Sequence, residues 1–276
     1  MGKLRVIKSG PLATIQDYGR YGFRKYGIPQ SGAMDKASMI RANRMAGNPD
    51  HYAVIEFGIS GLQLIAEEKT SIALQGASLS VNNERKTDRF CVVATGDEIT
   101  ISAPIDVYAY LAIAGKLKSK NDFGSFSTYL AGEFGGYGGR GLKAGDLLET
   151  IGKSKVSGLA INILDPDHTE VIRFMKGPES RMCESLDKKR YRISPASNRM
   201  GIRLEGSKLK AEMHEITSSA VIPGTIQLPP DGFPIVLMND CQTTGGYPRI
   251  GKVLDEDLGK LAQVKPIKEI MFQAVF

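Results

Sequence analysis

The chain has 276 residues, 42% of them hydrophobic, and a formal net charge of +6 at pH 7. This length suffices for two ordinary domains or one large β-rich domain, and the hydrophobic content supports a sizeable core. No apolar run reaches membrane-spanning length, and the N-terminus has no signal-peptide pattern, so we expect neither a membrane protein nor a secreted one. The three cysteines form no Cys-x-x-Cys pair, so we expect neither a disulfide scaffold nor a thiolate metal site.

Two short basic clusters, at residues 116–120 and 188–192, have no nucleic-acid-binding signature beside them. Short basic runs are usually solvated surface, so we expect no nucleic acid among the partners. The three histidines are too isolated to indicate a zinc site or a catalytic triad, and we expect no metal. These features together predict a cytoplasmic globular protein.

Apolar runs of strand length recur along the chain, separated by many of its 31 glycines and 13 prolines. Such spacing is typical of a mainly β protein with a few short helices. The predicted strands are residues 3–7, 62–65, 71–74, 90–94, 98–101, 107–114, 159–163, 170–174, 225–228, 234–238 and 269–275. The predicted helices are residues 34–46, with Ser31 or Gly32 as N-cap and Gly47 as the stop, and residues 256–264, with Asp255 as N-cap.

A faint internal repeat links the two halves of the chain. Its matching segments are residues 29–34 with 195–200, 61–64 with 224–228, and 72–74 with 235–237. The period is far too long for a solenoid, so it predicts two related β-barrel modules. The polar stretch at residues 152–157 suggests the boundary, and residues 165–168 are the alternative. The first choice gives an N-terminal module over residues 1–157 and a C-terminal module over residues 158–276, with strand exchange between them allowed.

A polar run that follows the predicted strand at residues 234–238 is the clearest candidate site for a small-molecule substrate. A buried strand that opens onto polar and glycine residues is how a rigid scaffold presents hydrogen-bonding groups to a small ligand. Carboxylate and amide side chains together can orient a lactam or urea-like N–H and deprotonate a water without a metal. The candidates are Asp240, Gln242 and Tyr247 for catalysis, and Gln227, Thr243 and Thr244 for substrate binding.

Two glycine-rich segments carry further candidates for substrate binding. Ser31 and Asp35 stand at the mouth of the first predicted helix, where backbone N–H groups suit a carboxylate or phosphoryl oxygen. The alternative is that they are only a cap and a first-turn acid. Tyr137 and Arg140 lie among glycines that would let an aromatic ring and a guanidinium approach a planar substrate, and a flexible surface loop is the alternative there.

Arg199 and Arg203 form the last candidate pair for substrate binding. On a strand, a spacing of four residues places two side chains on the same face, where the arginines could clamp an anion. Structural pairing with Glu205 or Glu215 is the alternative.

Several of these segments carry motifs of one known family. The motifs are GPLATIQDYGR at residues 10–20, PQSGAMD at 29–35, ANRMAGNP at 42–49, GGYGGRGLKAGD at 135–146, SNRMG at 197–201 and QTTGGY at 242–247. In this order, and over nearly the whole chain, the sequence resembles the allophanate hydrolase subunit 2 family, which is carboxyltransferase-like. The resemblance implies two cyclophilin-like β-barrel modules, in agreement with the internal repeat.

The resemblance implies a subunit of an ATP-dependent 5-oxoprolinase, a hetero-oligomeric hydrolase that opens 5-oxo-L-proline to L-glutamate. The partners would be subunits A and B, and this chain would be inactive alone. ATP would act at the level of the complex, because the chain has no phosphate-binding loop of its own. Two alternatives stay open: a biotin-dependent carboxyltransferase component that acts on urea or a similar amide, with biotin on a separate carrier, and a regulatory protein that antagonises a kinase inhibitor.

In the oxoprolinase interpretation the candidate residues divide between two tasks. Holding the substrate carboxylate or a phosphoryl intermediate would fall to Arg199, Arg203 and Ser31. Orienting the amide would fall to Gln227, Asp240, Gln242 and Tyr247.

Overall fold

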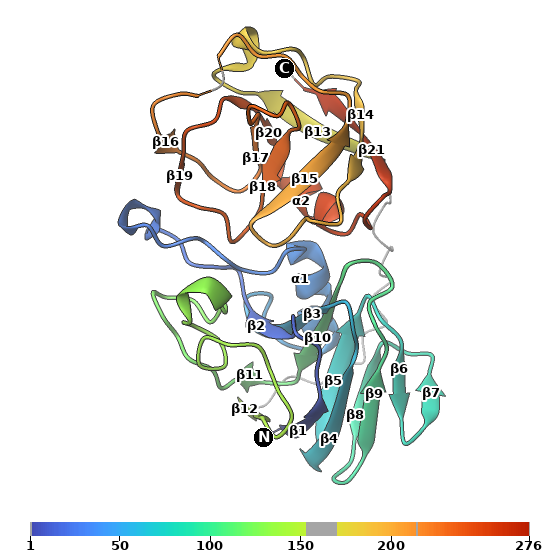
Figure 1. The fold of residues 1–276 in the computed structure, drawn as a ribbon. Coiled ribbons are helices and arrows are strands. Elements are labelled where there is room, and N and C mark those ends of the chain that lie inside the picture. The colour runs from blue at the N-terminus through green and yellow to red at the C-terminus, as the bar shows by residue number, and fades with distance from the viewer. Residues whose placement is uncertain (1, 153–169, 214, 276) are drawn as a thin grey trace. The chain divides into compact units, whose positions relative to one another are not determined.

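The computed structural model describes residues 2–152, 170–213 and 215–275. The chain divides into two compact units: unit 1 is Met1–Arg20 with Ser31–Leu164, and unit 2 is Tyr21–Gln30 with Asp165–Phe276. Strands dominate both units (Figure 1), so the predicted mainly β fold is confirmed. The strand expected at residues 159–163 and the module boundary expected between residues 157 and 158 lie outside the described residues.

Unit 1 is built from two antiparallel sheets. The seven-stranded sheet has the order β11-β12-β1-β4-β9-β6-β7, and the five-stranded sheet has the order β2-β3-β10-β5-β8. The strands are β1 (Lys3–Lys8), β2 (Thr14–Gln16), β3 (Val54–Gly58), β4 (Leu62–Glu68), β5 (Thr70–Gln75), β6 (Leu79–Val81), β7 (Glu84–Lys86), β8 (Phe90–Val93), β9 (Glu98–Ile101), β10 (Tyr108–Ile113), β11 (Lys116–Leu117) and β12 (Leu147–Ile151). A short 3₁₀ helix, η2 (Leu130–Gly132), lies between β11 and β12.

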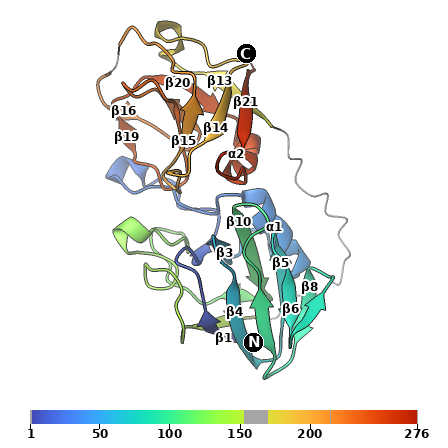
Figure 2. The ribbon, with the colours of Figure 1, turned by 45° about the vertical axis from the view of Figure 1, so that its right-hand side comes forward.

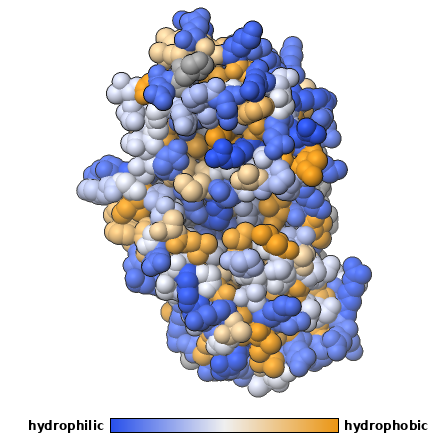
Figure 3. Space-filling model, in the orientation of Figure 1, coloured by the Kyte–Doolittle hydropathy of each residue, from blue (hydrophilic) through white to orange (hydrophobic). Residues whose placement is uncertain are grey.

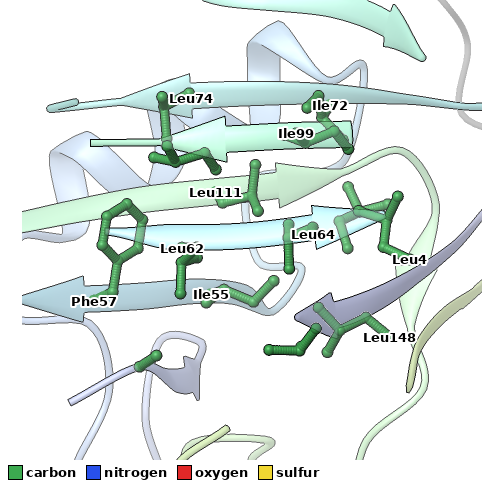
Figure 4. Close-up of a cluster of buried hydrophobic side chains, with 14 of the residues drawn as sticks. Leu4, Ile55, Phe57, Leu62, Leu64, Ile72, Leu74, Ile99, Leu111 and Leu148 are labelled. Carbon is green, nitrogen blue, oxygen red and sulfur yellow. The ribbon is translucent and has the colours of Figure 1, made fainter. Parts of the chain in front are cut away.

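The core of unit 1 lies between these two sheets. Leu4, Leu62 and Leu64 point inward from the seven-stranded sheet and meet side chains of the five-stranded sheet such as Ile55 and Leu111 (Figure 4). Along β4 the buried residues alternate with more exposed ones, as expected for a strand with one face in the core. Burying each such side chain contributes about 1.5–3 kcal/mol, which makes the sheet pair a rigid support for the loops at its edges.

Helix α1 (Lys36–Met45) covers the outer face of β10 and β5, as Figure 2 shows. Both strands are therefore buried along their whole length. The helix begins at Asp35, whose Oδ1 accepts a hydrogen bond from the Ser38 N–H at 3.0 Å, so the predicted cap at Ser31 or Gly32 was wrong. Ser31 instead has a left-handed backbone with φ 54°. The predicted stop at Gly47 is confirmed, since Gly47 has φ 71° and donates to the Arg44 carbonyl.

Unit 2 contains a closed barrel of seven strands in the order β13-β20-β17-β18-β15-β14-β21. Its neighbours pair antiparallel except β13 and β21, which are parallel. The barrel strands are β13 (Val171–Lys176), β14 (Arg190–Ile193), β15 (Gly201–Gly206), β17 (Thr225–Gln227), β18 (Ile235–Leu237), β20 (Arg249–Val253) and β21 (Glu269–Ala274). Unit 2 also contains a separate pair of strands, β16 (Ser219–Ala220) and β19 (Thr244–Gly245), and the 3₁₀ helices η1 (Arg24–Tyr26) and η3 (Ser180–Met182). Three rings, of Phe174, Phe272 and Tyr191, pack edge to face in the interior.

Helix α2 (Asp255–Ala262) packs against β13. Its N-cap position is Leu254, so the predicted cap at Asp255 was wrong by one residue. The buried Asp257 carboxylate accepts hydrogen bonds from Arg173 Nε and Nη2, each at 2.8 Å, which ties the helix to the barrel.

The face in Figure 3 shows hydrophobic residues scattered among hydrophilic ones. Among the described residues, no helix combines the length and the apolar character needed to cross a membrane.

Candidate functional site

A polar loop, residues 239–248, follows β18 of the barrel and is fixed by a buried ion pair near its start. Arg199 Nε donates to Asp240 Oδ2 at 2.7 Å, and Arg199 Nη2 donates to Asp240 Oδ1 at 3.2 Å. The two side chains are only 10% and 8% exposed. The Asp240 N–H also donates to the Arg199 carbonyl at 2.9 Å. Bidentate geometry in a buried setting fixes the direction of both side chains.

A second arginine fixes the far end of the loop. Arg249 Nη2 donates to Glu179 Oε1 at 2.7 Å, and Arg249 Nε donates to Glu179 Oε2 at 3.0 Å. This hydrogen bonding lowers the pKa of Glu179 although burial opposes the shift. The loop therefore begins and ends on arginine–carboxylate pairs.

Gln227, on β17, supports the loop from the barrel side. It is 2% exposed, its Oε1 accepts from Gln242 Nε2 at 3.3 Å, and its Nε2 donates to the Tyr247 carbonyl at 3.5 Å. A Cβ added at Gly245 would come within 2.5 Å of Gln227 Nε2, so a larger residue there would require the Gln227 amide to shift.

The middle of the loop packs on a small apolar cluster. Cys241 is fully buried and packs with Val221 and Leu237. Burial raises the pKa of the Cys241 thiol, and the nearby Arg24 guanidinium opposes that shift. The Val221 N–H donates to the Thr243 carbonyl at 3.1 Å, which closes the loop over this cluster.

The outward side of the loop carries the groups that can meet a ligand. Gln242, Thr244 and Tyr247 are exposed, and Thr243 is partly exposed. An amide, two hydroxyls and a phenol on a fixed loop can hydrogen-bond to a small polar molecule. The structure therefore gathers most of the predicted site residues of unit 2 at one loop, and these are Arg199, Gln227, Asp240, Gln242, Thr243, Thr244 and Tyr247.

The predicted arginine clamp is not formed as expected. Arg203 lies on β15 with an exposed side chain, but Arg199 lies in the bend that precedes this strand. The spacing rule failed because it requires both residues to be on the strand, and the strand begins at Gly201. Structural pairing, which was the alternative, does occur for Arg199, but with Asp240 rather than Glu205 or Glu215.

A second polar cluster lies in unit 1 at the start of α1. The Tyr110 hydroxyl donates to Glu56 Oε2 at 2.9 Å and accepts from the Asp35 N–H at 2.8 Å, while the Met34 N–H donates to the same Glu56 oxygen at 2.7 Å. Burial, followed by the carboxylates of Glu56 and Asp35, raises the pKa of Tyr110 well above its usual value. Ser31 is fully buried, and its Oγ has no hydrogen-bond partner among the described residues.

Tyr137 and Arg140 form a separate cluster in the glycine-rich loop of unit 1. Arg140 Nη1 and Nη2 donate to the two carboxylate oxygens of Asp146 at 2.6 and 2.7 Å, and the guanidinium lies 4.8 Å from the Tyr137 ring centre. The Tyr137 hydroxyl accepts from the Leu147 N–H at 3.1 Å. These contacts hold the loop in place and argue against the alternative of a flexible surface loop.

The motif at residues 10–20 also has a structural role. Asp17 Oδ1 accepts from the Ser125 and Ser127 hydroxyls at 2.6 and 2.5 Å. Arg20, which is 1% exposed, donates to the Ser127 carbonyl and lies 4.7 Å from the centre of the Phe134 ring. This network fixes the segment just before residue 21, where the chain passes from unit 1 to unit 2.

A family model described as "Carboxyltransferase domain, subdomain A and B" matches residues 26–274. The chain belongs to this carboxyltransferase domain family. It is 37% identical to the C subunit of 5-oxoprolinase from Escherichia coli, over 95% of this chain and 87% of that one. It is 35% identical to the C subunit from Haemophilus influenzae, over 95% of this chain and 88% of that one. The solved urea carboxylase of Kluyveromyces lactis superposes with a TM-score of 0.88 at 26% identity, and the match covers 99% of this chain but 27% of that one.

Within this carboxyltransferase-family chain, sequence reasoning missed Glu56, Tyr110, Glu179 and Arg24. Glu56 and Tyr110 lie in the fully buried strands β3 and β10. A polar residue within an apolar run was therefore the sequence signal that could have identified them, because a buried polar group needs a hydrogen-bond partner. Glu179 and Arg24 gave no signal, because their partners lie far along the chain.

Proposed function

We propose that this chain is the C-type subunit of an ATP-dependent 5-oxoprolinase, which opens 5-oxo-L-proline to L-glutamate together with subunits A and B. The observation that carries the proposal is the near full-length match to two proteins named as the C subunit of 5-oxoprolinase. The urea carboxylase match, by contrast, is lower in identity and covers about a quarter of that longer protein.

The chemistry of the lactam gives ATP a role in this proposal. An amide carbonyl is a poor electrophile, and transfer of a phosphoryl group from ATP to its oxygen yields ADP and an activated carbon. Water then adds to this carbon, and the ring C–N bond breaks with a proton passing to the nitrogen, which leaves an acyl phosphate. A second water hydrolyses the acyl phosphate, so that glutamate, ADP and phosphate are the products. ATP binding is assigned to the assembled complex rather than to this chain.

The loop geometry supports a division of labour among the candidate residues. Asp240 is already bound through both carboxylate oxygens by Arg199, so its proposed role is to hold the loop in the reactive arrangement. Gln242 and Tyr247 are exposed, and Gln242 Nε2 also donates to the buried Gln227. These two residues are proposed to orient the lactam amide and the attacking water. Thr243 and Thr244 supply further hydrogen bonds to the substrate.

The test is an omission experiment with purified components. This chain and candidate subunits A and B are mixed with ATP and 5-oxo-L-proline, and glutamate release is followed while each component is left out in turn. We expect no glutamate without this chain, and a loss of about 10²-fold or more in kcat for Gln242→Ala, the scale of losing one well-placed hydrogen-bonding group in an active site. Lys25→Ala, which changes an exposed side chain, is the matched control.

A carboxyltransferase is the second candidate, and the description of the family model favours it. In that reaction a carboxyl group passes from a biotin carrier protein to urea or a similar amide. The discriminating assay supplies a carboxylated biotin carrier and urea in place of ATP and 5-oxo-L-proline. Carboxyl transfer that depends on this chain, without glutamate formation in the first assay, would replace the oxoprolinase proposal.

A further inference from the structure

One segment of the N-terminal half belongs to unit 2. Residues 21–30, the arm, leave unit 1 after Arg20, group with unit 2, and return to unit 1 at Ser31. The arm has its own local structure: the Tyr26 N–H donates to the Phe23 carbonyl at 2.9 Å, and Gly27, with φ 79°, donates to the Arg24 carbonyl at 3.0 Å. The positive φ requires a glycine-like backbone at this turn.

The arm holds the 239–248 loop through one guanidinium. Arg24 Nη2 donates to the Gln242 carbonyl at 2.9 Å and to the Val221 carbonyl, and it lies 4.0 Å from Cys241 Sγ. Because the Val221 N–H donates to the Thr243 carbonyl, Arg24 and Val221 together bind two consecutive peptide units of the loop. Hydrogen bonds from a charged donor are about twice as strong as neutral ones, so this contact matters to the order of the loop.

We propose that Arg24 is a positioning residue for the loop that carries Asp240 and Gln242. With the arm docked, Arg24 fixes the backbone of Gln242 and covers the fully buried Cys241. With the arm detached, the loop keeps the ion pair of Asp240 at one end but loses its central anchor. The consequence for catalysis rests on the proposed function; the consequence for loop order does not.

The geometry predicts that lysine cannot replace Arg24. A guanidinium presents several N–H groups in a fixed plane and can serve two carbonyls at once, whereas an ammonium is a compact charge on a flexible stem. Arg24→Lys should therefore retain only part of the effect, and Arg24→Ala should lose all of it.

Cys241 provides a direct readout of arm docking. The described cysteines are all free, and Cys91 and Cys183 are partly exposed, so a Cys91→Ser, Cys183→Ser background leaves Cys241 as the reporting thiol. In this background we expect Arg24→Ala to speed modification of Cys241 by a disulfide reagent about 10–100-fold, which corresponds to about 1.4–2.8 kcal/mol of lost protection. Lys25→Ala should leave the rate unchanged. Equal rates in Arg24→Ala and its parent would overturn the proposal.

Hydrogen exchange and kinetics complete the test. We expect faster exchange at the amides of Asp240 and Cys241 in Arg24→Ala and Arg24→Lys, with unchanged protection in β13 and β17. Uniform loss of protection across the barrel would overturn the positioning role. In the assembled enzyme, Arg24→Ala should lower kcat at least about tenfold with little change in KM. If the unmodified complex forms no glutamate, the proposed function fails, whereas the thiol and exchange results still decide the role of Arg24.

Discussion

Replacing Arg199 by Met should destabilise the protein far more than removing both members of its ion pair. The pair is bidentate and about nine-tenths buried, and Arg199→Met leaves the Asp240 carboxylate in that environment without its guanidinium partner. Breaking a buried pair from one side costs about 3–5 kcal/mol. Replacing both partners by apolar residues, as in Arg199→Met with Asp240→Leu, is often neutral or stabilising by about 1–4 kcal/mol, because neither charge is then buried.

The chain offers a matched control with the same chemistry at the surface. Arg44 Nε and Nη2 donate to the two oxygens of Asp50 at 2.8 and 2.7 Å, but these side chains are 58% and 38% exposed. Solvent screens such a pair, and Arg44→Met should cost less than about 1 kcal/mol. The difference between the two sites therefore isolates the effect of burial from that of hydrogen-bond geometry.

The assay is urea unfolding followed by circular dichroism for the single and double variants of Arg199 and Asp240 and for Arg44→Met. The expected order of stability has Arg199→Met lowest, with the double variant at or above the parent. If Arg199→Met and Arg44→Met lost similar amounts, or if the double variant were less stable than Arg199→Met, the argument from burial would be refuted.

Three further predictions concern other parts of the chain. Although burial opposes ionisation, hydrogen bonds from Arg173 hold the pKa of Asp257 at about 2, below its unfolded value. Asp257→Asn should therefore lower the free energy of unfolding by about 1–2 kcal/mol at pH 7. Urea unfolding at several pH values should show that this difference from the parent fades between pH 4 and pH 2. Gly135→Ala would place a Cβ 2.0 Å from a backbone carbonyl oxygen and should cost about 3 kcal/mol or more, whereas Gly138→Ala, which meets nothing within 4 Å, should cost about 1 kcal/mol. Similar losses at both glycines would contradict this account. Burial raises the pKa of Cys91 to about 11, so its alkylation rate, followed by mass spectrometry, should still be rising at pH 10, and a plateau near pH 9 would contradict the shift.

The sequence predicted those parts of the fold that depend on local patterns. The alternation of Leu62 and Leu64 in β4 marks a strand with one buried face, and the apolar run of β10 marks a strand buried on both sides. The polar run after β18 likewise indicated the loop that carries Asp240, since a buried strand followed by polar and glycine residues needs no tertiary information to be recognised.

The remaining features depend on contacts between distant residues. Arg24 meets the carbonyls of Val221 and Gln242 across 197 and 218 positions of sequence, and no local pattern encodes that meeting. The predicted pairing of Arg199 with Arg203 on one strand face was wrong for a related reason. The partner of Arg199 is Asp240, which lies 41 residues away, and β15 begins after Arg199, at Gly201. Local signals thus indicated the candidate loop, whereas its supporting contacts required the structure.

The most direct test of the proposed function is the rate of glutamate formation from 5-oxo-L-proline and ATP by subunits A and B, measured with and without this chain. The account predicts stoichiometric formation of glutamate and ADP only when the chain is present, with a rate that falls sharply for Gln242→Ala. An equal rate in its absence, or no glutamate from a complete and stably assembled complex, would contradict the account.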